Sequence, residues 1–213
     1  MYLSRLVLNP HSRRTQKEIA NPYEMHRTVM HGFPPVLSQD NRVLFRLEVN
    51  PRNGIPSVLA QSLDMPDWSF LSEEGGKGYL LPMDEPNPAI KPYEPIFKKD
   101  QVLLFRLKAN PTLKHDDKRV GLYKEEGQST WLKRKAEAGG FHVLSVQADK
   151  KILVTGKILH EEERHDLKMF CVQFEGVLQV DNPEEMAQTI RKGIGSGKGL
   201  GFGLLSVMRP PES

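Results

Sequence analysis

The chain has 213 residues, a formal net charge of +3 and a pI near 8.9, so it is long enough for one large or two small domains that each bury a core. Hydrophobic residues make up 38% and charged residues 27% of the sequence, a balance that excludes wholesale disorder. No stretch approaches the roughly 20 apolar residues that span a bilayer, and the first nine residues do not resemble an export signal. We therefore expect a protein that is neither exported nor inserted in a membrane.

Charge and cysteine content point to a cytoplasmic protein with a weak preference for polyanions. A slightly basic balance favours partners such as nucleic acid, although many cytosolic enzymes share it. The single cysteine, Cys171, lies in the apolar run 169–174 and cannot form an intramolecular disulfide. We expect it to be buried, in a reducing compartment.

The first half of the chain predicts the element order βαββαβ. Proline cannot donate to a strand ladder, so the Asn-Pro pairs at 9–10 and 50–51 are expected to end the strands before them. Asn53-Gly54 marks a turn between the two strands of a hairpin. The predicted elements are a strand at 2–8, a helical region after it, strands at 43–49 and 57–61, a short helix at 64–71 and a strand at 79–81.

A proline-rich segment separates this half from the next. Five prolines lie between positions 82 and 95, with Asn, Asp and Glu among them, a composition typical of a linker. We therefore predict two domains, at 1–90 and 96–213.

The second half predicts another α+β unit. Gly139-Gly140 is expected to end its first helix, and Asp181 or Asn182, followed by Pro183, to begin its second. The predicted elements are strands at 102–109, 141–146, 152–160, 167–180 and 204–207, a basic hairpin-like piece at 118–123, and helices at 128–138 and after 181. The expected fold class is α+β, with two tandem ferredoxin-like domains joined by the proline-rich linker.

Glycine occupies every second position from 193 to 203, directly after a helix expected to end in Arg191-Lys192. Glycines at this density are needed where the backbone approaches something closely or adopts positive φ. A phosphate backbone is one such partner, since N–H groups can bind it while nearby cations add charge. The segment is neither a P-loop, because Lys198 precedes Gly199 and not Ser or Thr, nor a GxGxxG motif. A flexible connector or tight strand-helix packing is the alternative.

Asn21 and Pro22 predict a helix start, with Asn21 as N-cap and Glu24 completing an arrangement like a capping box. Tyr23 and His26 are then three residues apart on one face. Metal-free RNA cleavage requires the attacking 2′-OH to lose a proton and the leaving 5′-oxygen to gain one, and His26 suits either role. Tyr23 can position the 2′-OH or share the proton transfer, and the alternative is a helix-face histidine with no catalytic part.

No metal site is expected. The sequence has no CxxC and no dense set of carboxylates, and the HExxH-like stretch at 160–165 has its second histidine one residue too late for metal binding on one helical face. We therefore predict that the protein needs neither a metal nor another cofactor.

The motifs at the two ends of the chain together resemble one family. The Leu-Asn-Pro strand end at 8–10, the Asn-Pro-Tyr-Glu-Met-His-Arg segment at 21–27 and the glycine run leading into Leu-Leu-Ser at 204–206 are similar to those of CasE, the CRISPR RNA-processing endoribonuclease of subtype I-E systems. The resemblance spans 2–207. It implies a tandem ferredoxin-like fold that binds the stem-loop of the CRISPR repeat, cuts at the 3′ base of the stem without metal and keeps the product.

The resemblance also implies roles for individual residues. Tyr23 and His26 match the catalytic pair, and 193–203 matches the RNA-binding loop. Some members carry a further basic residue after the catalytic helix, where this chain has His31. The expected RNA-binding residues form three groups. Arg27 and His31 follow the catalytic pair, and Lys150, Lys151 and Lys157 belong to a basic hairpin of the second domain. The third group is the glycine run with the helix end before it: Arg191, Lys192, Gly193, Gly195, Ser196, Gly197, Lys198, Gly199 and Gly201.

The same resemblance implies the partners. They are the CRISPR repeat stem-loop, as precursor and mature RNA, and the other subunits of the Cascade complex, with the free protein a monomer. The alternatives are a non-catalytic subunit that binds an RNA hairpin, and a purely structural subunit whose glycine loop contacts protein.

Overall fold

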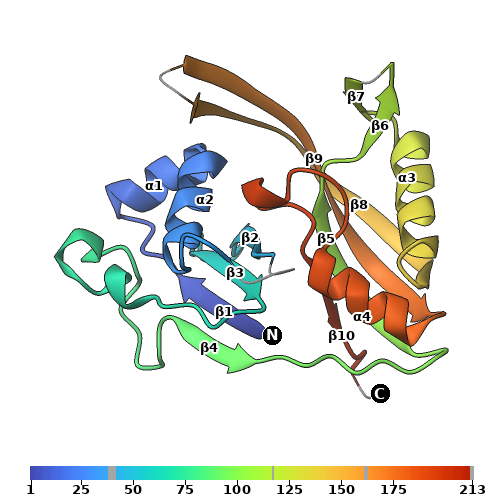
Figure 1. The fold of residues 1–213 in the computed structure, drawn as a ribbon, viewed down its shortest axis with the longest axis horizontal. Helices are drawn as coiled ribbons and strands as arrows, with labels where there is room; N and C mark the ends of the chain where they lie inside the picture. Colours follow the sequence, from blue (N-terminus) through green and yellow to red (C-terminus); the bar gives the residue numbers. More distant parts are fainter. Residues whose placement is uncertain (38–41, 117, 161–162, 212–213) are drawn as a thin grey trace. The chain divides into compact units, whose positions relative to one another are not determined.

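The computed structural model describes residues 1–37, 42–116, 118–160 and 163–211 (Figure 1). The chain divides into two compact units. One contains Met1–Glu94 with Thr155–Leu167 and Gly199–Gly201, and the other contains Pro95–Val154 with Lys168–Lys198 and Phe202–Ser213. Within the described ranges, no helix is long and apolar enough to cross a membrane.

The first unit is built on an antiparallel sheet with the strand order β2-β3-β1-β4 (Figure 1). Its helix α2 buries Met25 and Val29 in one hydrophobic cluster with the strand residues Leu6, Phe45 and Val58. The apolar face of α2 thereby fixes the helix on the sheet. The elements are β1 (Tyr2–Val7), α1 (Arg13–Ala20), α2 (Pro22–His31), β2 (Leu44–Val49), β3 (Pro56–Ser62), the 3-10 turns η1 (Ser69–Leu71) and η2 (Glu74–Gly76), and β4 (Ala89–Pro92).

Asn21 ends α1 and begins α2. Its backbone N–H donates to Lys17 O at 3.0 Å, while its side-chain Oδ1 accepts from the N–H of Tyr23 at 3.3 Å. The predicted N-cap and the proline at the first helical position are therefore confirmed. The capping-box role of Glu24 was wrong, because Lys17 O already takes the N–H of Asn21 and the Glu24 carboxylate accepts from Arg27 instead.

Two elements predicted before the linker are not formed. The helix at 64–71 is reduced to η1, because Asp67 Oδ1 accepts from Ser69 N–H in a local turn and Asp67 N–H donates to Gly32 O. The strand at 79–81 makes only the isolated bridge between Leu8 and Leu80.

The fourth strand of the sheet is β4, inside the segment predicted to be a linker. Asn87 explains how this segment joins the sheet. Its side chain accepts from Val7 N–H at 2.9 Å and donates to Val7 O at 2.8 Å and to Leu81 O at 2.9 Å. These contacts satisfy the end of β1 as a strand residue would, and β4 continues along β1 from there.

The second unit has the complete order βαββαβ, with the sheet order β10-β5-β9-β8. A hairpin of β6 (Thr112–His115) and β7 (Lys118–Gly121) is inserted after the first strand. The tilt between the rings of Trp131 on α3 and Phe174 on β9 is only 17°, with their centroids 6.2 Å apart, and both side chains are buried. The elements are β5 (Val102–Ala109), α3 (Glu125–Glu137), β8 (Phe141–His160), β9 (Glu163–Val180), α4 (Pro183–Lys192), η3 (Lys198–Leu200) and β10 (Leu205–Met208).

The strands predicted at 141–146 and 152–160 form the single 20-residue strand β8. The charged residues Asp149, Lys150 and Lys151 lie between the two predicted strands. β8 lies at the edge of its sheet, and charged residues are compatible with an edge strand because one side of its backbone needs no partner. In contrast, the strand at 102–109 and the Asn182 N-cap followed by Pro183 are confirmed.

We predict that Asn87→Ala lowers the free energy of unfolding by about 1 to 3 kcal/mol, because it leaves the buried N–H of Val7 without its acceptor, while Val7 O keeps the N–H of Leu81. Urea unfolding measures this change. Asn53→Ala is the matched control, since Asn53 accepts a local hydrogen bond from Ile55 N–H in an exposed turn. Equal losses of stability in the two variants would show that the hydrogen bonds between Asn87 and Val7 contribute no more than a local turn contact.

Candidate functional site

Tyr23 and His26 lie on the same side of α2 and are both half-buried. Their ring centroids are 6.4 Å apart, and the ring of His26 also lies 6.4 Å from that of Phe45, tilted by only 21°. Burial lowers the pKa of His26 below its ordinary value. The imidazole is therefore neutral at neutral pH and able to accept a proton.

Gly199 lies beside His26. The segment Gly199–Gly201 belongs to the same compact unit as α2. A Cβ atom placed on Gly199 would lie 3.5 Å from Cε1 and 3.6 Å from Nδ1 of His26, and one on Gly201 would lie 3.1 Å from the Phe45 ring. The two motifs singled out at opposite ends of the sequence thus meet at His26.

Most glycines of the run have a conformational reason to be glycine. Gly193, Gly195, Gly197, Gly201 and Gly203 all have φ between 68° and 85°, a region that residues with a Cβ rarely adopt. Gly199 is different, because its φ is not positive and a Cβ there would make only an ordinary contact. It is also exposed, so its missing side chain leaves open space next to His26.

Several polar groups of the glycine run form hydrogen bonds within the protein that stabilise the conformation of the run. Gly203 N–H donates to Lys108 O at 2.8 Å, and Ser196 forms an isolated bridge with Asn110. The ammonium group of Lys198 donates to Lys192 O at 2.7 Å, where a cation at the C-terminus of α4 is favourable. Of the predicted basic residues here, Arg191 and Lys192 are exposed.

The basic hairpin residues Lys150, Lys151 and Lys157 lie on β8, but their side chains fall outside the described residues. The backbone of β8 does approach the start of α2. A Cβ on Gly156, the neighbour of Lys157, would lie 2.6 Å from Oδ1 of Asn21. Any other residue at position 156 would therefore collide with Asn21 unless Asn21 moved.

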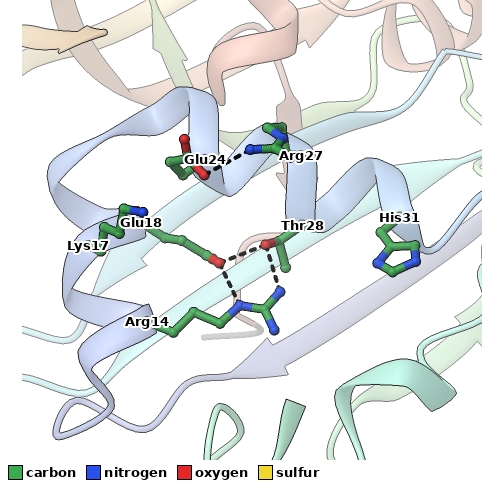
Figure 2. A pocket seen from close by; sticks show the side chains of 7 residues that line it. All are labelled: Arg14, Lys17, Glu18, Glu24, Arg27, Thr28 and His31. Atoms are coloured by element: carbon green, nitrogen blue, oxygen red, sulfur yellow. Dashed lines mark hydrogen bonds and ion pairs between the residues drawn. The ribbon is translucent and has the colours of Figure 1, made fainter. Parts of the chain in front are cut away.

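Arg27 and His31, also predicted to bind RNA, line a pocket between α1 and α2 with a volume of about 380 Å³ (Figure 2). Both side chains are exposed. Positions 24, 27, 28 and 31 of α2 share one helical face, while Tyr23 and His26 occupy the adjacent one. We call this cavity the α1–α2 pocket; its remaining lining residues are Arg14, Lys17, Glu18, Glu24 and Thr28.

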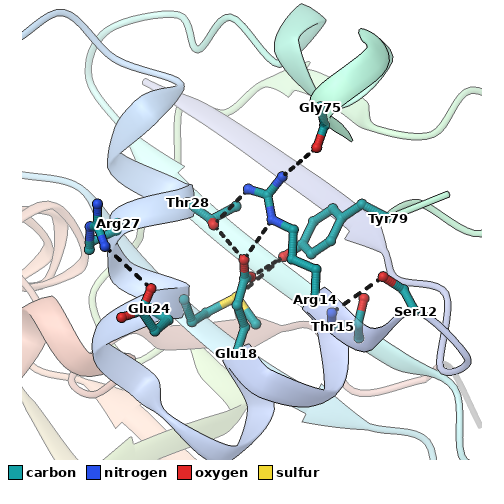
Figure 3. Close-up of polar contacts among 10 residues, drawn as sticks. Ser12, Arg14, Thr15, Glu18, Glu24, Arg27, Thr28, Gly75 and Tyr79 are labelled. Carbon is teal, nitrogen blue, oxygen red and sulfur yellow. Dashed lines mark hydrogen bonds and ion pairs between the residues drawn. The ribbon is translucent and has the colours of Figure 1, made fainter. Parts of the chain in front are cut away.

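A buried carboxylate network lies beneath the α1–α2 pocket (Figure 3). Glu18, which is 4% exposed, accepts hydrogen bonds from Arg14 Nε at 2.9 Å, Thr28 Oγ1 at 2.6 Å and the Tyr79 hydroxyl at 2.6 Å. Burial and then the Glu18 charge raise the pKa of Tyr79. The network joins both helices to Tyr79.

Sequence reasoning missed this network. Arg14 and Glu18 are four residues apart on α1, a spacing that predicts an ion pair. Tyr79 lies 61 positions from Glu18, so no local pattern could have indicated it.

In the part of the chain that the structure describes, no three His, Cys, Asp or Glu side chains lie close enough to hold a metal ion. Cys171 is buried as predicted, and burial raises the pKa of its thiol to about 11.

Residues 1–209 match the model of a protein family described as CRISPR associated protein. The chain belongs to this family. It is 41% identical to the CRISPR-associated endoribonuclease Cse3 of Thermus thermophilus, over 97% of this chain and 99% of the relative. It is 26% identical to the CRISPR system Cascade subunit CasE of Escherichia coli, over 97% of this chain and 98% of the relative.

Solved structures of this family have the same fold. A structure of the CRISPR endoribonuclease Cse3 bound to 19 nt RNA matches with a TM-score of 0.84 and 40% identity, covering 98% of this chain and all of that one. Thermus thermophilus Cse3 bound to an RNA representing a pre-cleavage complex matches with a TM-score of 0.81 and 39% identity, covering 97% and 98%. The resemblance inferred from the two end motifs and the α+β fold class are therefore confirmed.

We predict that alanine substitution destabilises the protein at one glycine of the run and has almost no effect at the next. Gly197→Ala should lower the unfolding free energy by about 1 to 3 kcal/mol, because φ is 74° and its Cβ would lie 2.4 Å from Met169 Cε. Gly199→Ala should change it by less than about 0.5 kcal/mol. Thermal unfolding of the two variants, with Gly75→Ala as an exposed control, measures the difference. A Gly199→Ala loss as large as that of Gly197→Ala would contradict it.

Proposed function

We propose that this chain is an endoribonuclease that cuts precursor CRISPR RNA at the 3′ base of the repeat stem-loop and remains bound to the product hairpin within Cascade. The observation that carries the proposal is the position of neutral His26 between Tyr23 and the exposed Gly199. Relatives named as a CRISPR-associated endoribonuclease and as a Cascade subunit support it, as does the structural match to Cse3 bound to RNA.

In the proposed reaction, the pair supplies both proton transfers without a metal ion. Neutral His26 accepts the proton of the 2′-OH, whose oxygen then forms a bond to phosphorus. The bond from phosphorus to the 5′-oxygen breaks, and the Tyr23 hydroxyl donates its proton to that leaving oxygen. The products are a 2′,3′-cyclic phosphate, or the 3′ phosphate formed from it by water, and a 5′-OH.

The remaining predicted residues bind and orient the RNA in this proposal. Backbone N–H groups of the glycine run contact phosphates, and Arg191 and Lys192 add positive charge there. Lys198 acts by fixing the loop to the end of α4. Lys150, Lys151 and Lys157 contact the stem, and Arg27 and His31 contact the RNA backbone next to the phosphate that is cut. The free protein is a monomer, and the other Cascade subunits are its protein partners.

The second candidate is a non-catalytic subunit that binds the same hairpin. It is favoured only if Tyr23 and His26 stack against bases without moving protons. Loss of cutting with retained binding in a His26 variant separates the two functions.

We predict that the protein in excess EDTA cuts a repeat hairpin with a normal 2′-OH at the cut site and leaves the 2′-deoxy hairpin intact. His26→Ala should lower the single-turnover rate by about 10²- to 10⁴-fold while RNA affinity stays nearly unchanged. The exposed His11 provides the control, since His11→Ala should cut at the wild-type rate. Tight binding of both hairpins with no cutting of either would make the chain a binding subunit.

The pH dependence should follow the neutral form of His26. Because burial lowers its pKa, the acceptor form persists below the ordinary histidine pKa of about 6.5. The single-turnover rate should therefore rise with pH under acidic conditions and level off before neutrality, and His26→Ala should abolish the rise. A rate that falls with increasing pH through this range would assign His26 as the proton donor instead.

A further inference from the structure

We infer that the α1–α2 pocket binds the phosphate backbone of the single-stranded RNA that follows the cut bond, with Lys17 and His31 at its two ends and Arg27 between them (Figure 2). The inference rests on the proposed function, because it assigns a further part of the same substrate. It adds Lys17 on α1, which none of the sequence motifs had indicated.

The charge of the α1–α2 pocket favours an anion. Two of its seven lining residues are carboxylates, against three permanent cations and one histidine (Figure 2). Glu18 is buried and already accepts three hydrogen bonds, so its charge is compensated within the protein. Arg14 is fixed in the floor by donating to Glu18, Thr28 and Gly75 O.

Two cations at the rim are available to a ligand. Lys17 is exposed, and among the described residues no carboxylate pairs with it. Arg27 pairs with Glu24 at 3.4 Å, but its side chain is 66% exposed. An exposed pair of this kind is weak, so Arg27 can turn to a phosphate at little cost and form a stronger, charge-assisted contact.

The pocket also lies in the right place for the strand that leaves the catalytic pair. Arg27 is four residues after Tyr23 and one after His26, so it stands between their helical face and that of the pocket. Gly199 lies on the His26 side. RNA held by the glycine run at His26 would therefore pass Arg27 and enter the pocket.

The edge of the pocket offers a surface for a base. The ring of exposed His31 lies against Phe70, with centroids 4.3 Å apart and a tilt of 37°. Aromatic side chains of this kind stack unpaired bases without selecting their sequence. Proteins that bind single-stranded RNA combine phosphate contacts with stacking surfaces of this kind.

The test compares two repeat hairpins, one with an extended 3′ flank after the cut bond and one ending a single nucleotide after it. Both carry 2′-deoxy at the cut site, so that binding is measured without cleavage. Lys17→Gln should weaken binding of the flanked RNA by about tenfold and lower the slope of log affinity against log salt by roughly 0.7. Binding of the short RNA should stay unchanged.

Arg13→Gln is the matched control, because Arg13 is an exposed cation on the same helix that does not line the pocket. It should bind both RNAs like the wild type, and both variants should unfold at the wild-type temperature. Equal losses for the two RNAs, or no loss for either, would overturn the inference. So would unchanged RNA binding together with lost assembly by Lys17→Gln, since the pocket would then bind an acidic group of a protein partner.

Failure of the proposed function would show separately. In that case the wild type would leave normal 2′-OH versions of both hairpins uncut, whereas the flank-dependent binding loss of Lys17→Gln would still report on the pocket. A binding loss confined to the flanked RNA supports the pocket whether or not the chain cuts.

Discussion

The buried carboxylate of Glu18 holds the helix that carries Tyr23 and His26. It receives donors from α1, from α2 and from Tyr79, and each donor offsets part of the cost of removing a charge from water. Removing one donor would leave that charge under-compensated in the interior, so the three segments are tied to one arrangement. The position of the His26 ring depends on this arrangement as well as on its own contacts with Tyr23 and Phe45.

The glycine run has two separate roles. Most of its glycines allow a left-handed backbone that folds back on itself, with Ile194 N–H donating to Gly203 O and Gly203 N–H donating to Lys108 O. Gly199 has no such role and faces solvent beside His26. Positive φ, one of the two reasons that the sequence offered for the glycines, therefore applies to most of them, whereas close approach of a ligand remains the proposal for Gly199.

Local chemistry explains what the sequence could predict. Asn21 with Pro22 and Asn182 with Pro183 begin α2 and α4 because side-chain capping acts within three residues. β5 was predicted with its observed bounds, since alternating burial and a following Asn-Pro are local signals. The end motifs were enough to place the chain in its family.

What the sequence could not predict depends on residues far apart in the chain. β4 forms because Asn87 reaches Val7, 80 positions away, and β8 continues through charged residues because it has a neighbour in β9. The candidate site follows the same division. Tyr23 and His26 were proposed from their helix, whereas Lys17 enters the proposed site only because α1 lies against α2. The hydrogen bond from Lys198 to Lys192 O likewise depends on how the loop folds.

The junction at Asn21 has a consequence for how the chain can vary. Asn21 is both the C-cap of α1 and the N-cap of α2, so no other residue separates the two helices. A residue inserted there would lengthen the junction and change the direction in which α2 leaves α1, which would move the Tyr23–His26 face away from Phe45. Insertions and deletions should therefore be tolerated in the surface turns of this unit but not between Ala20 and Pro22.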